Sequence, residues 1–566
     1  MARPIWIEPS PVRSGGPLLH RDPLLHQLLA TRVMNPQEAA DFLDARERPL
    51  PDPSLLPGMD AAVERIAHAL RRNERIAVFG DYDADGVTST AILALALRSA
   101  SGGQAPADIA LPTRADGYGL NPSSIEQFAA NGATLLIAVD CGSGDHEHVA
   151  KALALGMDVV AIDHHELPNG PAEGAIVASA RLESGAPYRD LPAAALALLA
   201  ATALARLGFD AGDGPGNDPR RLLDLAMIGI LADVCRLTGT NRGMVRDGLR
   251  WVRTDPRPGL RALISALGKD HRAIDSRIVG HHVAPALNAP GRRGNPWPAL
   301  DLLLANDALS ANKWVTEAIA AREWARTRRS ALVARELENL RADPDLDRRS
   351  VLVVALDDCP HGLAGLVSIG LASELGRPTV VLARDGDIYR GSARTVAGFD
   401  IGGALQEVSH LLVRVGGHRQ AAGLTVEANR VDELREALEA VVDRAGLAAA
   451  PPELRLDAEI APERVALDTI TLLDGLRPFG EGNEDPLLLV RGVQVRETRT
   501  MGEGGKHLKI GLAGAGGAAA ILWGEGARIR EIGPRARLDL AGRLSRNTWN
   551  GRTDPQMILA DFRPAS

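Results

Sequence analysis

The sequence predicts two α/β domains joined by a long helix and followed by a small C-terminal β-barrel. Short apolar segments alternate with helical stretches between about residues 60 and 235, which is typical of a parallel sheet covered on both faces. The same alternation returns after a long polar stretch, and beyond it short strand-like segments alternate with glycine turns. A chain of 566 residues is also too long for one ordinary core, which favours several domains.

The first elements along the chain are an N-terminal arm and the first α/β domain. Residues 1–60 are rich in proline and contain one helical stretch, Pro36–Leu43. The α/β pattern then begins with a helix over Ala61–Arg72. Its predicted strands are Arg75–Gly80, Leu135–Val139 and Val159–Ile162.

A polar helix from about Ser310 to Arg341 leads to the second α/β domain, whose predicted strands are Val351–Leu356 and Thr379–Leu382. The helical spacing puts three arginines on one face, for which we expect solvent exposure, with a DNA-facing role as the alternative: Arg322, Arg326 and Arg329. Ala445–Pro452 is a predicted linker, and the barrel follows it. Its Trp523 and Trp549 are either base-stacking platforms or core residues.

Composition excludes several classes of protein. With 45% hydrophobic residues and glycine and proline spread along the chain, intrinsic disorder is not expected. Three cysteines form no disulfide framework, which indicates a reducing cytoplasmic location. The N-terminus has no secretory h-region, and the longest apolar run, Leu191–Ala205, is too short for a membrane span, so we expect no membrane association.

The net charge of −8 and the aromatic content of 3% argue mildly against a nucleic-acid-binding protein. The charge is unevenly distributed, however. Residues 487–566 hold 13 Lys and Arg against 7 Asp and Glu, a net of +6, which leaves −14 on the first 486 residues. The predicted barrel is therefore the part suited to phosphate backbones, and few aromatic rings are available for stacking.

Acidic and histidine side chains follow the three predicted strands of the first domain. Because the carboxyl ends of parallel strands meet at one edge, we expect these side chains to lie together. A fourth contributor, Asp233, follows the apolar segment Leu225–Leu231. The strand-end residues are Asp81, Asp83, Asp85, Asp140, Asp163, His164 and His165.

Each motif alone has an ordinary interpretation. The first acidic motif suits a turn or a Ca²⁺ loop, Asp140 suits a helix N-cap, and a His-His pair is more often surface or core than ligand. Together, so many acids at one edge require a neutralising cation. Aspartate with imidazole and no thiolate cluster favours Mn²⁺ or Mg²⁺, and two such ions suit hydrolysis of phosphoesters or phosphoanhydrides. No serine elbow, Walker A loop or dinucleotide fingerprint is present.

These residues resemble the four motifs of the DHH phosphoesterase superfamily, and within it the single-strand-specific bacterial exonucleases. The motifs are Asp81-Tyr-Asp-Ala-Asp-Gly86, Asp140-Cys-Gly142, Asp163-His-His165 and Ala232-Asp-Val234. Further matches are Arg114–Leu120, Gly391–Arg394, Gly416–Gly423, Pro478–Asn483 and Lys506–Lys509. The resemblance implies a DHH domain over 61–250, a helical connector over 251–345, a DHH-associated substrate-binding domain over 346–445 and an OB-fold over 453–566.

The resemblance also implies residue roles and two Mn²⁺ or Mg²⁺ ions. The implied metal ligands are Asp83, Asp85, Asp140, His164 and Asp233. Asp81 and Asp163 support that shell and His165 contacts the scissile phosphate. The implied substrate contacts are Arg114, Asn288, Arg292, Ser392, Arg394, Gly416, Gly417 and His418.

The sequence departs from the family pattern at three places. Ala286 replaces the first arginine of a Pro-Arg-x-Asn-Ala-x-Gly-Arg motif, Cys359-Pro-His361-Gly362 replaces Trp-His-x-Gly, and Cys235-Arg236 stands where Val-Pro is common. None of these positions is an implied ligand. The departures concern substrate contacts and end-group preference.

The function implied is 5′-to-3′ exonucleolytic hydrolysis of single-stranded DNA to 5′-mononucleotides in repair and recombination. The implied partners are single-stranded DNA, a single-strand-binding protein and a helicase. One alternative is a DHH-type hydrolase of short oligonucleotides or cyclic dinucleotides, although such proteins lack the arm and the barrel. Another is a non-catalytic DNA-binding scaffold, which would have eroded ligands, whereas all the expected acids and His164 are present.

Overall fold

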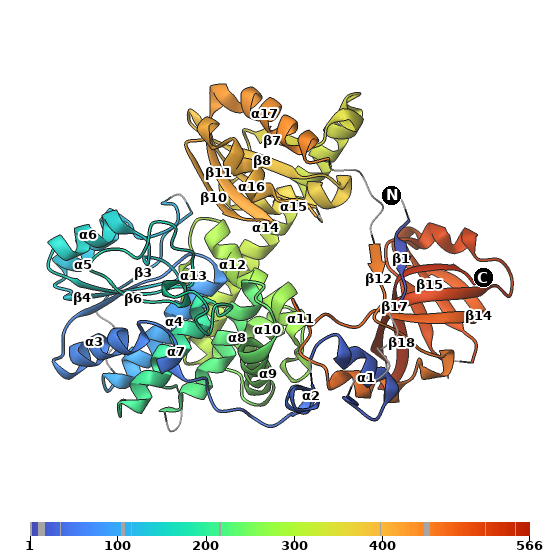
Figure 1. Ribbon diagram of the computed structural model, residues 1–566, viewed down its shortest axis with the longest axis horizontal. Helices are drawn as coiled ribbons and strands as arrows, with labels where there is room; N and C mark the ends of the chain where they lie inside the picture. The colour runs from blue at the N-terminus through green and yellow to red at the C-terminus, as the bar shows by residue number, and fades with distance from the viewer. Residues whose placement is uncertain are drawn as a thin grey trace. The chain divides into compact units, whose positions relative to one another are not determined.

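The structure, a computed structural model, describes residues 3–9, 17–33, 35–103, 108–114, 116–213, 217–396, 398–446, 453–514, 517–549 and 551–565. Residue contacts divide the chain into two compact units, Arg48–Ala449 and Met1–Glu47 with Ala450–Ser566. Figure 1 shows the elements of each unit. The predicted fold class is confirmed: two α/β sheets, a long helix and a closed barrel. Among the described helices, none combines the length and apolar character of a membrane span.

A five-stranded parallel sheet, in the order β3-β2-β4-β5-β6, carries the acidic motifs. Its strands are β2 (Ile76–Phe79), β3 (Asp108–Ala110), β4 (Leu135–Val139), β5 (Asp158–Ile162) and β6 (Ile176–Ala178). One face packs on α3 (Met59–Arg71), α4 (Ala84–Ala100) and α7 (Ala193–Arg206), and the other on α5 (Pro122–Ala130) and α6 (His146–Ala154). Because both faces are covered, β2 and β4 are buried at every position and their sequences are continuously apolar.

Helices then follow up to the second sheet. They are α8 (Leu223–Ala232), α9 (Gly239–Thr254), α10 (Pro258–Ala266), α11 (Ser276–Ile278), the π-helical turn η6 (Val279–Val283), α12 (Ala284–Arg292), α13 (Trp297–Leu304) and α14 (Ala308–Ala342). The predicted long helix is therefore confirmed as α14. Its arginine face is only partly in solvent, because Arg329 Nε donates to the carbonyl of Leu366 at 3.1 Å. The expectation of solvent exposure was wrong for Arg329, because the long helix packs against residues that cover the second sheet.

The second sheet has the order β10-β11-β9-β8-β7, and only β7 and β8 run parallel. Its strands are β7 (Leu352–Leu356), β8 (Thr379–Asp385), β9 (Ile388–Arg394), β10 (Arg414–His418) and β11 (Ala421–Glu427). α14 and α15 (Ala364–Leu375) cover one face, and α16 (Ile401–Glu407) and α17 (Val431–Arg444) cover the other. Of the predicted linker Ala445–Pro452, residues 447–452 lie outside the described residues.

The second unit is a barrel that also includes the N-terminal arm. Its strands are β13 (Ala458–Glu459), β14 (Leu488–Met501), β15 (His507–Leu512), β16 (Ala519–Leu522), β17 (Arg537–Trp549) and β18 (Arg552–Pro564), and α18 (Leu467–Asp474) packs on them. β14 pairs with both β15 and β17, which closes the barrel. The helices of the arm, α1 (Pro23–Ala30) and α2 (Pro36–Leu43), contribute to the barrel's core, and β1 (Ile5–Ile7) pairs in parallel with β12 (Glu453–Arg455).

Both tryptophans of the barrel lie at its surface. Trp523 is 53% exposed and Trp549 is 73% exposed, so the core interpretation of these residues was wrong. Trp523 follows β16, and its ring meets the imidazole of His507 edge-on at 4.7 Å. Trp549 ends β17, at the tip of the long β17–β18 hairpin.

Candidate metal centre

The first acidic motif is positioned by the start of α4, directly after β2. Oδ1 of Asp83 accepts hydrogen bonds from the backbone N–H groups of Asp85 and Gly86, at 2.9 and 3.0 Å, and so caps the helix. Residue 86 has to be glycine, since a Cβ there would lie 2.6 Å from the Cβ of Asp81. The helix start therefore brings Asp81, Asp83 and Asp85 together at the sheet edge.

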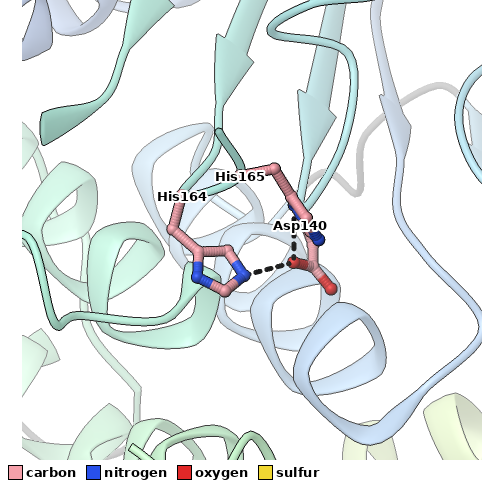
Figure 2. A group of neighbouring side chains, drawn as sticks. All are labelled: Asp140, His164 and His165. Carbon is pink, nitrogen blue, oxygen red and sulfur yellow. Dashed lines mark ion pairs between the residues drawn. The ribbon is translucent and has the colours of Figure 1, made fainter. Parts of the chain in front are cut away.

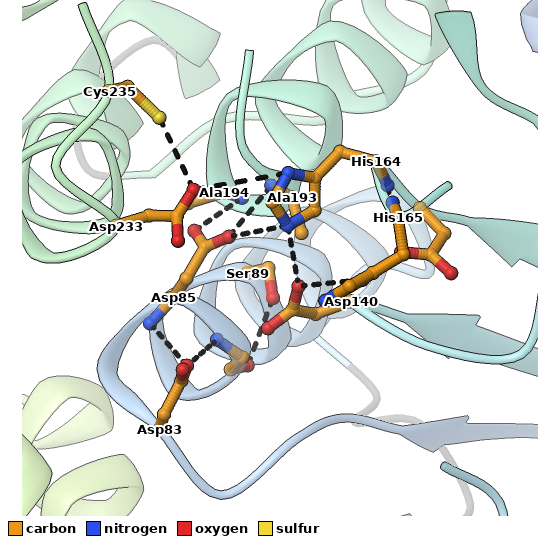
Figure 3. A network of polar contacts seen from close by, with 12 residues as sticks. Asp83, Asp85, Ser89, Asp140, His164, His165, Ala193, Ala194, Asp233 and Cys235 are labelled. Carbon is orange, nitrogen blue, oxygen red and sulfur yellow. Dashed lines mark hydrogen bonds and ion pairs between the residues drawn. The ribbon is translucent and has the colours of Figure 1, made fainter. Parts of the chain in front are cut away.

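A second helix fixes Asp85. Its carboxylate oxygens accept hydrogen bonds from the N–H groups of Ala193 and Ala194, at 2.8 and 3.0 Å (Figure 3). These residues begin α7, whose N-terminal dipole also favours a negative charge. The carboxylate of Asp85 is thus buried, and both of its oxygens are held by the start of α7.

Asp140 and His164 come from the ends of β4 and β5 and face each other. Nε2 of His164 lies 3.2 Å from Oδ1 of Asp140, as Figure 2 shows. Asp140 has a φ of 64°, a left-handed conformation that a non-glycine residue holds only when its surroundings enforce it. On the other side of the imidazole, Nδ1 of His164 lies 3.9 Å from Oδ2 of Asp233, which caps the C-terminus of α8.

Asp163 lies behind this edge and organises the two histidines. It is 1% exposed, and Oδ1 accepts hydrogen bonds from the backbone of His164 at 2.7 Å and from Nδ1 of His165 at 2.8 Å. Its other oxygen accepts the hydroxyl of Ser143. The phenol of Tyr118 also contacts Nδ1 of His165, at 2.9 Å. These contacts leave Nε2 of His165 as the nitrogen available to a ligand.

The carboxylates repel one another strongly without a cation. Burial, and then the charge of Asp83, raise the pKa of Asp81 to about 8. Burial and neighbouring carboxylates also raise the pKa values of Asp85 and Asp140 well above their usual range, and burial raises that of Asp233. Such a cluster is stable in its charged form only with bound positive charge.

The two histidines differ in charge. Burial, and then the charge of His165, lower the pKa of His164, so that its imidazole is neutral, the form that ligates metal. Burial alone would lower the pKa of His165, but the hydrogen bond and charge of Asp163 outweigh it and raise that pKa to about 9. The Asp163 carboxyl, opposed by burial but held by His165, has a pKa well below its usual range.

The donor set fits divalent cations. Oδ1 of Asp81 and Oδ1 of Asp140 are buried and accept no hydrogen bond from the part of the chain that the structure describes. Ligand atoms of Asp140, His164 and His165 lie within 4.8 Å of one another, and so do those of Asp81, Asp83 and Asp140. Two overlapping groups that share Asp140 suit a pair of ions, and oxygen with imidazole suits Mn²⁺ or Mg²⁺.

A cavity of about 280 Å³ is lined by half of the predicted site residues. All five implied metal ligands line it, together with Asp81, His165, Tyr82, Arg114 and Tyr118. The guanidinium of Arg114 lies 4.3 Å from the ring centroid of Tyr82, and its Nε is buried without a hydrogen bond among the described residues. The guanidinium of Arg114 and the charged imidazole of His165 therefore line an otherwise acidic cavity and suit a phosphate there.

The remaining predicted substrate residues lie outside that cavity. Oδ1 of Asn288 accepts the N–H of Ala84 at 2.8 Å, so this side chain also supports the α4 cap. Arg292 is half-buried, and its Nη1 donates to the carbonyl of Gly362 at 3.0 Å. Its pKa is lowered to about 10 by burial and then by the charge of Arg114, with Arg394 adding to the effect.

The predicted substrate residues of the second sheet lie on β9 and β10. Nη1 of Arg394 donates to Oγ of Ser392 at 3.0 Å. Burial, and then the charge of Arg114, lower the pKa of Arg394, so the two guanidiniums are neighbours. Gly416, Gly417 and His418 are exposed on the edge strand β10.

Sequence reasoning did not assign roles to several residues that shape the site. Tyr118 contacts His165, and the available sequence signal was its place in the Arg114–Leu120 motif. Ser143 follows the Asp140 motif directly. Ala193 and Ala194 act through their backbone N–H groups, and the pattern of side chains along the sequence does not indicate such contacts.

Known proteins match the whole chain. Three family models match: the DHH family N-terminal domain over residues 75–230, the DHHA1 domain over 349–444 and the RecJ OB domain over 456–561. The single-stranded-DNA-specific exonuclease RecJ of Bacillus subtilis is 32% identical over 96% of this chain and 68% of its own length. The protein of the same name from Dickeya dadantii is 31% identical over 96% of both chains.

Among solved structures, RecJ from Thermus thermophilus in complex with Mn²⁺ matches with a TM-score of 0.80 and 28% identity, over 100% of this chain and 80% of that one. The same protein in complex with Mg²⁺ matches with a TM-score of 0.73. The metals that the donor set favours are thus the ones held by these similar structures.

Proposed function

Because this chain belongs to the RecJ family of single-stranded-DNA-specific exonucleases, we propose that it is a divalent-metal-dependent exonuclease acting on single-stranded DNA. It releases 5′-mononucleotides in the 5′-to-3′ direction. Its work lies in repair and recombination, in the cytoplasm, beside a single-strand-binding protein and a helicase. The observation that carries the proposal is the pair of overlapping ligand groups that share Asp140.

In this proposal Asp83, Asp85, Asp140, His164 and Asp233 hold the ions. When bound, two divalent ions supply an acidified water and stabilise the attacking and leaving oxygens of an in-line displacement. Asp81 and Asp163 support the ligands. His165, charged because of Asp163, donates from Nε2 to the scissile phosphate.

The substrate's phosphates bind to the arginines beside the centre. Arg114 lines the cavity, and its charge lowers the pKa values of Arg292 and Arg394, which therefore lie near it. Guanidinium groups bind phosphate oxygens in pairs, so half-buried arginines that pair with no carboxylate among the described residues suit this role. Asn288, Ser392 and the exposed Gly416–His418 segment complete the substrate contacts.

The five-part division from the sequence remains our proposal for the functional domains, with residues 1–60, 61–250, 251–345, 346–445 and 453–566. The last of them, the barrel, binds single-stranded DNA away from the reacting end. Its outer face carries Arg499 and Lys509, which pair across β14 and β15, and His507 with the exposed Trp523. Cations with a neighbouring ring suit a single-stranded backbone with an occasional stacked base.

Mn²⁺-dependent digestion of single strands labelled at either end tests the activity and its direction. We expect release of labelled mononucleotide at once from 5′-labelled strands and only late from 3′-labelled strands. Strands with and without a 5′-phosphate show the end-group preference. Digestion confined to substrates of two to five nucleotides would favour the short-oligonucleotide hydrolase instead.

The matched variant is Asp83→Asn. Asparagine keeps the oxygen that caps α4 and removes the charge, so the fold should be unchanged. We expect cleavage to fall at least about 10³-fold, equivalent to about 4 kcal/mol of barrier, while DNA binding persists. Full cleavage by this variant would show that Asp83 is not a ligand, and loss of binding as well would indicate a damaged fold.

A further inference from the structure

A second cavity lies at the far end of α4 from the metal centre. It has a volume of about 640 Å³, and many of its lining residues come from α4, α10, α13 and α14, the helices labelled in Figure 1. Asp83 caps one end of α4, whereas Leu95 and Arg98 near the other end line the cavity. At 1.5 Å per residue, Arg98 is about 20 Å along the helix from Asp85. The cavity is therefore separate from the proposed catalytic site.

Guanidinium groups dominate the wall of this cavity. Among the described lining residues, the cations are Arg98, Arg221, Arg257 and Arg261, and the carboxylates are Asp213 and Asp255. Arg257 forms the rigid part: it is 5% exposed, and it donates to both oxygens of Asp224 at 2.8 and 2.7 Å. Its Nη1 lies 3.2 Å from Asp213.

The other arginines have unused donors. Neither Arg98 nor Arg261 has a side-chain partner within the described ranges of the chain. Arg221 lies over the ring of Trp251 at 4.6 Å and pairs with the exposed Asp255, but its Nε is buried without a hydrogen bond there. The half-buried guanidinium of Arg98 and the start of α10 at Pro258 line the same cavity, and both favour an anion.

The rest of the lining defines what kind of anion fits. Leu95, Leu303 and Leu304 supply an apolar surface, and Asn306 and Asn312 supply amide groups. The volume far exceeds that of a bare phosphate and falls within the usual range for small-molecule sites. An apolar wall, amides and a cluster of guanidiniums together match a phosphate joined to a flat base.

From this geometry we propose that the cavity is a second ligand site, which binds a nucleoside monophosphate. Arg98 and Arg261 hold the phosphate, the leucines contact the base, and the Arg257–Asp224 pair keeps the wall in place. The site goes beyond the proposed function and does not rest on it, since its ligand is bound and not cleaved.

Isothermal titration with dAMP tests the site. The full chain is dialysed against EDTA and carries Arg394→Ala, so that neither metal nor the proposed substrate arginine retains nucleotide at the other cleft. Inorganic phosphate and deoxyadenosine are titrated separately as fragments of the same ligand. We expect one dAMP per chain, bound more tightly than either fragment.

In the same background, Arg98→Ala and Arg261→Ala should each weaken dAMP binding at least tenfold. Arg72→Ala, which removes an exposed arginine of the same unit outside the cavity, should bind dAMP as the background does. Arg261 is exposed, so its replacement keeps the test valid if Arg98→Ala does not fold.

Three results would overturn the proposal: no binding of dAMP, unchanged binding in both arginine variants, or phosphate bound as tightly as dAMP. None of these readouts involves cleavage. Failure of the nuclease proposal would leave them unaffected, so the two outcomes can be told apart.

Discussion

The acidic edge of the first sheet and the outer face of the barrel place charge in opposite ways. At the edge, Asp85 and Asp163 are buried, and each accepts two or more hydrogen bonds, Asp85 from the start of α7 and Asp163 from the two histidines. On the barrel, Arg499 and Trp523 are exposed, and neither has comparable anchors. Buried charge makes strong, specific and pH-dependent interactions, whereas exposed charge makes weak ones that salt screens.

The largest expected effect concerns the stability of the buried edge. Because Asp81 titrates near pH 8 and Asp85 and Asp140 are raised as well, the metal-free native state binds more protons than the unfolded state between about pH 4 and 8. Its unfolding free energy should therefore fall as pH rises through that window. His165, raised to about 9, acts in the same direction.

Thermal unfolding in EDTA should show a Tm that falls by several degrees from pH 5 to pH 8. Mn²⁺ replaces the missing protons, so it should raise the Tm more at pH 8 than at pH 6. Asp83→Asn serves as the control, and Mn²⁺ should raise the Tm of this variant less than that of the parent protein. An equal metal effect at both pH values would contradict the titration of these carboxylates.

The next effect concerns the barrel. Trp523→Ala should weaken binding of a long single strand by about 1–3 kcal/mol, the usual contribution of one stacked base. Fluorescence anisotropy in EDTA measures it without cleavage. Trp549→Ala is the matched control at the hairpin tip, and an equal loss there would argue against a local platform beside His507.

A smaller effect is expected at Tyr118, which contacts His165 at the acidic edge of the first sheet. Removing its hydroxyl in Tyr118→Phe deletes one contact with His165, which should lower kcat about fivefold and leave KM nearly unchanged. A pH–rate profile separates a positioning role of Tyr118 from a folding defect. Loss of positioning shifts the part of the profile that reports the pKa of His165, whereas a folding defect does not. A profile identical to that of the parent protein would exclude the role.

The smallest effect is expected for single cations on the outer face of the barrel, such as the half-buried Lys509. Lys509→Ala should weaken DNA binding only about two- to threefold near physiological salt, which is less than about 1 kcal/mol. It should also reduce the slope of log affinity against log salt by about 0.7, the value for one released counterion on a single strand. An unchanged slope would remove Lys509 from the proposed DNA path.

Much of the acidic edge of the first sheet was predictable, because each of its motifs directly follows a short apolar strand in the sequence. β4 has the predicted bounds, since a run of apolar residues ending in Asp140 leaves little freedom. The convergence of the acidic motifs follows from the parallel order of β2, β4 and β5 alone. Asn288 as a support for the α4 cap required the fold, since it lies far along the chain from Ala84.

The barrel was less predictable, because its burial pattern depends on pairings between distant strands. From the sequence alone, Trp523 and Trp549 suit a core position as well as a surface position. The register of β15 and β16 places Trp523 on the outside of the barrel, opposite His507. The sequence of the N-terminal arm does not indicate which segment of the chain the arm pairs with. Its β1 strand pairs with β12, and such a contact has no local signature.

That pairing has a consequence for synthesis. Ile5 lies beside Glu453, and the indole of Trp6 donates to Asp561 at 2.8 Å. The ribosome makes this strand well before its partners, so the arm waits unpaired while residues 48–449 emerge and fold as a unit. The arm can pair only after β12 and Asp561 have been synthesised, and a chain cut before β12 would carry an unsatisfied strand.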